Sequence, residues 1–456
     1  MCGIAGKVYE DKEERVAAAL LRQMCQTMVH RGPDDEGFYL DKNVGLCMRR
    51  LQVIDLEGGH QPMANEDQSL WVVFNGEIYN YQELRRELEA RGHHLRTASD
   101  TEVILHLFED EGIDCLQRLR GMFALAIWDS RGEKLFLARD RLGKKPLYYA
   151  PLQGALSFAS ELGVLACDRQ VDTTVDPAAI DEYLTYLFVP HPRTIYRGAR
   201  KLPPASYAVY HQGKLQVERY WQVRYDAIDP APSLDDSVLQ LDELLREAVR
   251  LRLLADVPVG AFLSGGLDSS LIVALMQELG GRRVKTFSIG FEDSSFSELH
   301  HARQVARALD TDHEEFTVSY QVQELLPQLL DHFGEPFADS SAIPTYHLSK
   351  LTRKQVTVAL SGDGGDEVFG GYRRYQARLL AGGYNRWPAF LGRGLVDGVG
   401  RIMREPATYY GTSLSKKFKR FTEFAAMVRE APQTSWAFFL PSGKKMRCMR
   451  KILPII

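Results

Sequence analysis

Hydrophobic residues in the first third of the chain fall into short runs typical of paired strands. The apolar run 71–74 ends in an Asn-Gly turn signal, and the helical periodicity of residues 81–92 closes on a glycine. Further on, apolar runs at 121–129 and 134–150 are separated by Ser-Arg-Gly, which predicts a hairpin. This part of the chain is predicted to pair its strands locally and to cover them with helices.

The pattern changes in the second half, where strand-like and helical runs alternate. A helical run at 234–254 precedes an apolar strand at 257–263, a glycine-rich turn and a helix that runs from Leu271 to Gly280. Strands are expected next at 284–291, 313–318 and 356–360, with helices at 298–310 and at 323–333, the latter interrupted by Pro327. This alternation predicts an open parallel sheet with right-handed crossovers and a ligand crevice beyond the strand carboxyl ends.

A domain boundary is expected in the Pro-rich stretch between about 166 and 235, which contains turn signals at four prolines. The length of 456 residues exceeds what one hydrophobic core usually serves, so two domains are predicted. We divide the chain into residues 2–212 and 213–456.

Composition and charge narrow the class of function. With 56 Lys and Arg against 60 Asp and Glu, the formal net charge is −4, which argues against a general nucleic-acid or anionic-membrane binder and favours small-molecule substrates. No apolar run reaches membrane-spanning length, and the N-terminus lacks a signal-peptide layout, so a cytoplasmic protein is predicted. The six cysteines have no metal-ligand or disulfide-framework spacing and are interpreted as free thiols.

Cys2 stands directly after the initiator Met. Removal of Met1 would leave a thiol and an α-amine on one residue, and the amine, with an ordinary pKa of about 7.7–8.0, can act as the base that activates the thiol. The alternative is an incidental small residue after Met.

Two glycine-rich loops each follow an apolar strand in the second half. The first, residues 264–270 (SGGLDSS), lies between a strand and the start of a helix, where backbone N–H groups and the helix dipole favour a bound anion. It lacks the Gly-Lys-Ser/Thr of a Walker loop. The second, residues 361–367 (SGDGGDE), adds carboxylates suited to magnesium and a charged substrate.

Five segments of the first hundred residues, MCGIAG, HRGPDDEG, RRLQVIDL, FNGEIYN and SDTEV, together resemble the class II, N-terminal-nucleophile glutaminase domain. The resemblance implies a four-layer αββα domain of α+β class with Cys2 as nucleophile. Asn75 and the Gly76 amide would donate to the oxyanion, for which a plain hairpin turn is the alternative. Arg50 would bind the glutamine carboxylate, for which a solvated surface role is the alternative. The remaining glutamine-binding residues would be Val53, Ile54, Glu77 and Asp100, with the two carboxylates taking the ammonium group. Arg139 and Asp140, in the adjoining similar segment, are expected to form a structural ion pair.

The two loops resemble those of glutamine-hydrolysing asparagine synthetases, whose Rossmann-like α/β domain has a pyrophosphatase loop and cleaves ATP to AMP and pyrophosphate. In this family Asp363 would assist formation of β-aspartyl-AMP, although many members carry Glu there, and Asp268 and Asp366 would bind Mg²⁺. The nucleotide-binding residues implied by the resemblance are Leu263, Ser264, Gly265, Gly266, Asp268, Ser269, Ile289, Ser361 and Gly362.

The predicted enzyme takes glutamine, ATP and a carboxylate, and aspartate is the expected acceptor. The segments GGHQPM, RLGKKPLYYA and RTIYRGARKLPPA are also similar to amidotransferases associated with exopolysaccharide and exosortase genes, so another acceptor is the alternative. A third interpretation is a nucleotide-binding or regulatory protein without synthetase activity. An apolar ammonia channel between the domains is expected on chemical grounds, and a homodimer is one option that the sequence leaves open.

The resemblance fades near Ser442, and the last 14 residues, GKKMRCMRKILPII, are abruptly basic. Family members continue further, with a lysine that contacts pyrophosphate. A frameshift or early stop is the preferred interpretation, and a genuine short variant is the alternative. The basic group Lys416, Lys417, Lys419 and Arg420 is predicted to be a solvated face, with a phosphate contact as the alternative.

Overall fold

A computed structural model of the chain describes residues 1–224, 233–292, 297–318 and 322–386, together with 418, 421, 422, 424, 425 and 449. The basic group at 416–420, apart from residue 418, and the tail from 443, apart from residue 449, lie outside the described residues. The chain forms two compact units, one of residues 1–183 and 188–361, the other of 184–187 and 362–456. The domain boundary at 212/213 stays a prediction.

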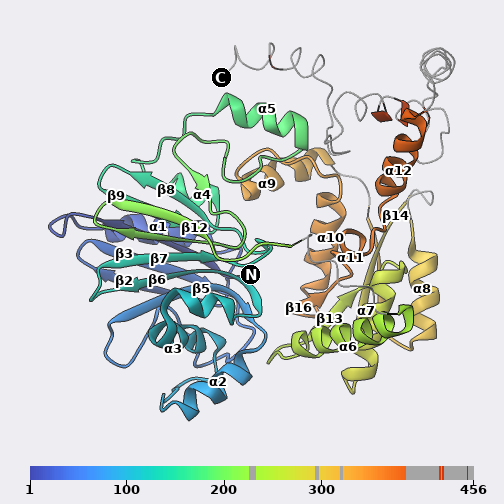
Figure 1. Cartoon of the computed structure of the whole chain (residues 1–456), viewed down its shortest axis with the longest axis horizontal. Coiled ribbons are helices and arrows are strands. Elements are labelled where there is room, and N and C mark those ends of the chain that lie inside the picture. The colour runs from blue at the N-terminus through green and yellow to red at the C-terminus, as the bar shows by residue number, and fades with distance from the viewer. Residues whose placement is uncertain are drawn as a thin grey trace. The chain divides into compact units, whose positions relative to one another are not determined.

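Two six-stranded sheets form the N-terminal part of the first unit (Figure 1). All the pairings in both sheets are antiparallel. One sheet has the order β10-β8-β9-β1-β3-β2, with β1 Gly3–Tyr9, β2 Asp35–Asp41, β3 Val44–Arg50, β8 Tyr148–Leu152, β9 Ala155–Ala159 and β10 Arg200–Lys201. The other has the order β12-β11-β7-β6-β5-β4, with β4 Met63–Ala64, β5 Leu70–Ile78, β6 Gly121–Asp129, β7 Lys134–Arg139, β11 Ser206–His211 and β12 Lys214–Arg219.

The two sheets pack face to face through one apolar layer, because alternate side chains of their strands point between them. Ile4, Val8 and Leu46 of the first sheet meet Val73 and Leu137 of the second in one buried cluster. Outside the first sheet lie α1 Ala18–Thr27 and α4 Leu162–Leu165, and outside the second lie α2 Tyr81–Ala90, α3 Asp100–Glu111 and the 3₁₀ turn η1 Gly112–Gln117. A further helix, α5, spans Pro177–Tyr186. The four layers confirm the predicted αββα glutaminase fold.

The expected turn at Asn75-Gly76 is wrong, because β5 continues through both residues to Ile78. Asn75 is paired with Ala124 and Gly76 with Phe123 of β6. A Cβ atom on Gly76 would lie 2.2 Å from the carbonyl oxygen of Met122. The glycine therefore serves the close approach of two strands rather than a change of chain direction.

A third sheet in the same unit is fully parallel and has the order β15-β14-β13-β16. Its strands are β13 Val259–Phe262, β14 Lys285–Phe291, β15 Asp312–Val318 and β16 Val358–Leu360. The helices are α6 Leu234–Arg252, α7 Leu267–Leu279, α8 Leu299–Ala308, α9 Val322–Phe333 and α10 Ala342–Thr352. Helices α6, α7 and α8 share a buried cluster with β13, and α10 packs against β14 and β15. The predicted Rossmann-like α/β sheet is confirmed.

Strands β13 and β16 are neighbours although about 100 positions of the chain separate them, so the strand order reverses at this pair. Their carboxyl ends lead directly into Ser264 and Ser361, at the kind of switch point where open α/β sheets bind ligands. One local expectation fails nearby, since Pro327 lies inside α9 and the helix runs on through it.

The described part of the second unit contains two helices. Helix α11, Gly365–Phe369, follows Gly364, which has a φ of +96°, and α12 spans Arg373–Asn385. Ala381 of α12 packs with Phe424 and Ala425 in a small apolar cluster. Among the described helices of both units, none is long and apolar enough to cross a membrane.

Candidate active site

Cys2 lies immediately before β1, an inner strand that β3 and β9 flank. Its Sγ accepts a hydrogen bond from the backbone N–H of Leu51 at 3.4 Å, and its carbonyl oxygen accepts one from Arg31 Nε at 2.9 Å. Both ends of the residue are therefore fixed by segments distant in sequence. A chain terminus that would ordinarily fray is held in place.

A small cavity opens beside the thiol and brings together most residues predicted to bind glutamine. It measures about 20 Å³, roughly the room of one water molecule. The lining residues are Cys2, Arg50, Leu51, Val53, Ile54, Gln61, Phe74, Gly76, Glu77, Ser99, Asp100 and Thr101.

Arg50 is buried at the end of β3 and does not have the solvated surface position that was the alternative. Its Nη2 donates to the carbonyl oxygens of Ile54 at 2.9 Å and Asp55 at 2.7 Å. A Cβ atom on Gly59 would come within 2.0 Å of the same nitrogen. The loop after β3 thus wraps the guanidinium, which also lines the cavity and suits a carboxylate ligand.

Glu77 and Asp100 supply two carboxyl groups to the same cavity. Burial, and secondly the nearby charge of Asp100, raises the pKa of Glu77 well above its ordinary value. Burial raises the pKa of Asp100 to about 6, although its Oδ2 accepts a hydrogen bond from the Ile78 N–H at 2.9 Å. Two poorly solvated acids side by side form a site that an ammonium group would stabilise.

Asn75 is fully buried, and neither its Oδ1 nor its Nδ2 has a hydrogen-bond partner among the residues that the structure describes. On β5 its side chain shares a face with Val73, which belongs to the apolar cluster that Cys2 also contacts. A buried amide without partners is unfavourable by about 1–3 kcal/mol, which calls for a ligand that completes its bonding. A developing oxyanion next to Cys2 is such a ligand.

The thiol and the chain terminus share a poorly solvated environment. Burial raises the pKa of the Cys2 thiol above its ordinary value. Burial also lowers the pKa of the terminal amine of Met1 to about 5, so this amine is neutral at pH 7. A neutral amine beside a thiol has the protonation state that a general base requires.

Sequence reasoning missed several residues of this cavity. The side chain of Gln61 donates to Thr101 Oγ1 at 3.0 Å and accepts from the Phe74 N–H at 2.7 Å, and so ties α3 to β5. Lys145 does not line the cavity, but its buried side chain interacts with two residues that do: burial lowers its pKa, while the charges of Cys2 and Glu77 raise it. Both residues stand in segments similar to family members, GGHQPM and RLGKKPLYYA, but nothing in those patterns indicates a contact with the thiol site.

The expected ion pair between Arg139 and Asp140 does not occur in the described part of the chain. Arg139 donates to the carbonyl oxygens of Gly143, Lys145 and Leu202, each at 2.7 Å. Asp140 accepts backbone N–H groups of the same turn and of Phe123. The two charges satisfy backbone groups of the surrounding segments instead of each other.

A second candidate region is the loop between β13 and α7. Gly265 has a φ of +80°, and a Cβ there would lie 2.5 Å from the Ala302 amide nitrogen. Ser269 Oγ is 2.9 Å from Ser264 Oγ, and Ser264 Oγ accepts the Gly266 N–H at 3.2 Å. Asp268 lies in the first turn of α7. A thirteen-residue helix that starts at a glycine turn rich in hydroxyls and N–H groups is suited to phosphate.

The other predicted nucleotide residues divide between the two units. Leu263 and Ile289 lie on or beside the neighbouring strands β13 and β14, and Ser361 follows β16. Gly362, Asp363 and Asp366 belong to the second unit, where Asp366 is in the first turn of α11. The joint metal site of Asp268 and Asp366 therefore stays a prediction.

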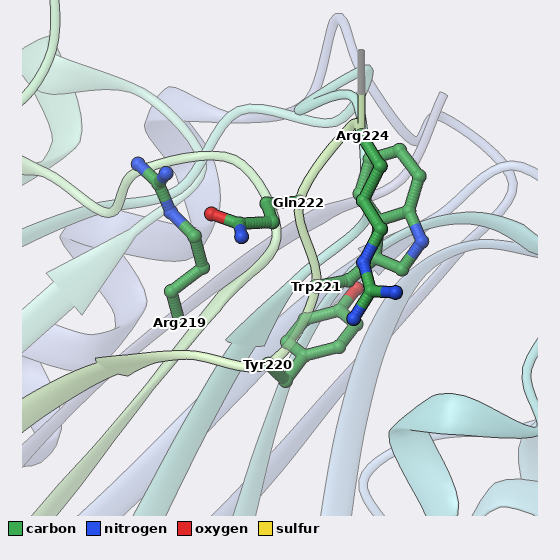
Figure 2. Close-up of a pocket in the computed structure, with 5 residues that line it drawn as sticks. All are labelled: Arg219, Tyr220, Trp221, Gln222 and Arg224. Atoms are coloured by element: carbon green, nitrogen blue, oxygen red, sulfur yellow. The ribbon is translucent and has the colours of Figure 1, made fainter. Parts of the chain in front are cut away.

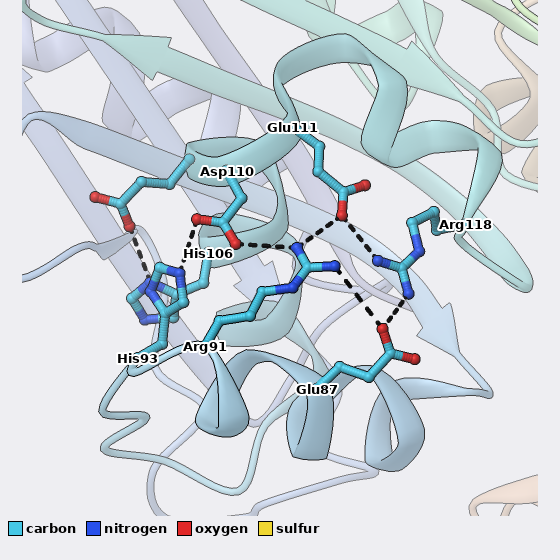
Figure 3. A network of polar contacts seen from close by, with 8 residues as sticks. Glu87, Arg91, His93, His106, Asp110, Glu111 and Arg118 are labelled. Carbon is cyan, nitrogen blue, oxygen red and sulfur yellow. Dashed lines mark hydrogen bonds and ion pairs between the residues drawn. The ribbon is translucent and has the colours of Figure 1, made fainter.

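Helix α3, whose first residue is Asp100, is anchored on its outer side by a chain of ion pairs (Figure 3). The chain runs from Glu87 through Arg118, Glu111, Arg91 and Asp110 to His93. In the described residues His93, His106 and Glu109 are also close enough to hold a metal ion. Each imidazole there already bonds to a carboxylate, His93 to Asp110 and His106 to Glu109, and none of these residues lines the Cys2 cavity.

A larger pocket of about 750 Å³ lies along the segment after β12 and is lined by Arg219, Tyr220, Trp221, Gln222 and Arg224 (Figure 2). The Arg141 guanidinium lies 5.6 Å from the centre of the Trp221 ring. None of the predicted site residues lines this pocket, so size alone does not identify the active site.

Comparison with known proteins assigns both halves of the chain. The family model described as glutamine amidotransferase domain matches residues 1–221, and the one described as asparagine synthase matches residues 240–448. The class is therefore that of a glutamine amidotransferase domain joined to an asparagine synthase domain.

Three curated relatives carry the same description. Asparagine synthetase [glutamine-hydrolyzing] 1 of Bacillus subtilis (strain 168) is 40% identical over 409 residues, which cover 89% of this chain and 64% of the relative. Putative asparagine synthetase [glutamine-hydrolyzing] 2 of Methanocaldococcus jannaschii is 36% identical over 414 residues, covering 86% and 79%. A putative asparagine synthetase [glutamine-hydrolyzing] of Mycobacterium tuberculosis (strain ATCC 25618 / H37Rv) is 37% identical over 419 residues, covering 87% and 64%.

The chain belongs to the family of glutamine-hydrolysing asparagine synthetases. It spans about two thirds of the length of the Bacillus and Mycobacterium relatives.

Proposed function

We propose that the chain is a glutamine-dependent amidotransferase that hydrolyses glutamine in its N-terminal domain and amidates a carboxylate, aspartate in the first place, at the expense of ATP. The observation that carries the proposal is the single cavity lined by a thiol, a guanidinium and two carboxyl groups. These are the groups that a zwitterionic amino acid with a reactive side-chain amide requires.

In the proposed glutaminase reaction, Met1 is removed and the amine of Cys2 becomes the chain terminus. The Cys2 amine, with an ordinary pKa of about 7.7–8.0, then takes the thiol proton. The thiolate attacks the glutamine side-chain carbonyl, Asn75 Nδ2 and the Gly76 N–H stabilise the oxyanion, and ammonia leaves. Water then hydrolyses the thioester to glutamate.

Binding energy for glutamine comes from its zwitterionic end in this proposal. Arg50 pairs with the α-carboxylate, while Glu77 and Asp100 pair with the α-ammonium group. Val53 and Ile54 line the wall of the cavity.

In the synthetase reaction, we assign phosphate binding to residues 264–269, with Asp268 and Asp366 as the residues that would hold Mg²⁺. The glycine turn at the start of α7 supports this assignment. Magnesium would neutralise phosphate charge when bound. Leu263, Ile289, Ser361 and Gly362 would contact the nucleotide, and Asp363 the acceptor carboxylate as it is adenylated. A cytoplasmic location agrees with these small-molecule substrates and is part of the proposal.

One experiment separates the proposed reactions. Intact mass before and after treatment with a glutamine-analogue electrophile, together with glutamate release, tests the thiol site. Release of AMP and pyrophosphate with aspartate and a panel of other acids then identifies the acceptor. Labelling of Cys2 with no release of AMP for any acid would leave a glutaminase and remove the synthetase part of the proposal. Release only with a sugar acid would support the exopolysaccharide alternative.

A further inference from the structure

The rim of the glutamine cavity is hydrogen-bonded to the segment that begins the parallel sheet. Asp256 Oδ2 accepts the backbone N–H of Asp55 at 2.8 Å, and the Asp256 N–H donates to the carbonyl oxygen of Val53 at 2.9 Å. The two bonds join residues about 200 positions apart within the first unit. No other role in the proposed chemistry requires Asp256.

Asp55 is the centre of the rim because it uses every polar group it has. Its carbonyl oxygen accepts from Arg50 Nη2, and its carboxylate accepts the N–H groups of Gly58 at 2.9 Å and Ala98 at 2.8 Å. Ala98 stands two residues before Asp100. Asp55 therefore fixes both the side of the cavity that carries Arg50 and the side that carries Asp100. Its remaining polar group, the backbone N–H, donates to Asp256.

The conformation of Asp55 needs this support. Its φ of +51° lies in the left-handed region, which Asp adopts more readily than most non-glycine residues but still at some cost in strain. The bond to Asp256 orients the N–H of this residue. Without the acceptor, the backbone at Asp55 is free to return to a more favourable conformation, and the carbonyl that holds Arg50 would move with it.

The other end of the contact leads into the sheet. Asp256 stands three residues before β13, and the carbonyl oxygen of Pro258 accepts the N–H of Thr357 at 3.1 Å, just before β16. The segment 256–258 is thus attached to both strands whose carboxyl ends carry the predicted nucleotide loops. A displacement of either strand would therefore be transmitted to Val53 and Asp55 through the bonds of Asp256.

We propose that Asp256 is a positioning residue for glutamine: it holds Val53 and Asp55, and through Asp55 the Arg50 guanidinium, in the arrangement that accepts the glutamine carboxylate. The inference rests on the proposed glutaminase function. Leu51, Val53 and Ile54 of the loop after β3 line the cavity, and Asp256 restrains this loop through its bonds to Val53 and Asp55. By thermodynamic reciprocity, occupation of the cavity should also alter the protection of the segment around Asp256.

The chain offers a matched control. Arg120 and Glu247 form an ion pair of 2.7 Å that also joins the N-terminal sheets to α6, but both side chains are well exposed and neither contacts the rim. Exposed pairs of this kind contribute little to stability. Glu247→Gln removes the ion pair between the same two parts of the chain without touching Asp55.

The test compares Asp256→Ala, Asp256→Asn and Glu247→Gln with the unchanged full chain. Glutamate release should show a KM for glutamine raised about tenfold in Asp256→Ala with kcat within about threefold, since a hydrogen bond to a charged group commonly has an effect of this size. Asp256→Asn keeps an oxygen acceptor and should restore most of the affinity. Glu247→Gln should leave KM unchanged.

Hydrogen exchange gives a second readout on the unchanged chain and decides the question if Asp256→Ala does not fold. Labelling of Cys2 with the glutamine-analogue electrophile should change amide exchange in residues 253–258 as well as 51–59. The inference is overturned if folded Asp256→Ala has an unaltered KM for glutamine. It is also overturned if the rate of amide exchange in residues 253–258 is the same before and after labelling of Cys2. Absence of glutamate release and of Cys2 labelling in the unchanged chain would instead remove the proposed function.

Discussion

The Cys2 thiol and the Leu51 amide are joined by a 3.4 Å hydrogen bond across 49 residues of sequence. Leu51 directly follows Arg50, so the proposed nucleophile and the proposed carboxylate clamp are held in register by one backbone contact. An N–H aimed at sulfur also favours the thiolate over the thiol, which opposes the effect of burial.

We expect Cys2→Ala to abolish glutamate release and labelling by a glutamine-analogue electrophile, because Cys2 is the only thiol among the described residues that line the cavity. Cys167→Ala provides the control, since this half-buried thiol does not line the cavity and should leave both activities unchanged. Glutamate formation by Cys2→Ala at the rate of the unchanged chain would assign the chemistry to another residue.

Asn75→Leu should separate activity from stability. We expect kcat to fall about 10²–10³-fold with little change in KM, because an oxyanion donor acts mainly in the transition state. The melting temperature should stay equal or rise, because Leu removes a buried amide with no partner in the described structure.

Asn65→Leu is the counterpart to this variant. Its buried amide donates to Ser69 Oγ at 3.0 Å and accepts from the Leu70 N–H at 3.0 Å, so its loss should lower the melting temperature. If Asn75→Leu lowers the melting temperature more than Asn65→Leu does, the amide of Asn75 has a structural role and is not a free donor for the oxyanion.

Gly59→Ala should weaken glutamine binding without a change in any polar group. A Cβ atom at this position would lie 2.0 Å from Arg50 Nη2, so the guanidinium must shift. We expect the KM for glutamine to rise about tenfold or more, measured by glutamate release. Gly163→Ala is the matched control, since its Cβ meets nothing within 4 Å, and a KM rise of the same size there would point to a general loss of structure.

Glutamine affinity should fall in mild acid because Asp100 must be ionised to pair with an ammonium group. With burial raising the pKa of Asp100 to about 6, the ionised form prevails above this pH and is lost below it. Protonation of this one carboxylate then makes the KM for glutamine about tenfold higher at pH 5 than at pH 7. Asp100→Asn should have a high KM and a flatter profile over this range, and an unchanged steep profile would shift the titration to Glu77 or another group.

The sequence predicted which residues meet at one cavity better than it predicted the local conformation of the backbone. Cys2, Arg50, Glu77 and Asp100 were chosen from motifs, and all of them line one cavity. Asn75-Gly76 was interpreted as a turn, because Asn-Gly usually is one, but strand pairing on both sides overrode the local preference.

Other features depend on tertiary contacts that no local pattern carries. Gln61 joins α3 to β5 at the cavity. Asp256 accepts a hydrogen bond from Asp55 although about 200 positions of sequence separate the two residues. Pro327 has the residue type of a helix breaker, yet α9 passes through it. The ion pair expected for Arg139 and Asp140 failed for a related reason, since neighbours in sequence found backbone partners elsewhere in the fold.

The place of β1 has a consequence for how the protein loses activity. Strand β1 lies inside its sheet, with β3 on one side and β9 on the other, so the first residues of the chain cannot detach without opening both ladders. Heat inactivation of glutaminase activity should therefore coincide with cooperative unfolding of the whole sandwich rather than precede it. The proposed nucleophile Cys2, although it stands next to the chain terminus, should therefore have the same kinetic stability as the core strand β1 that follows it.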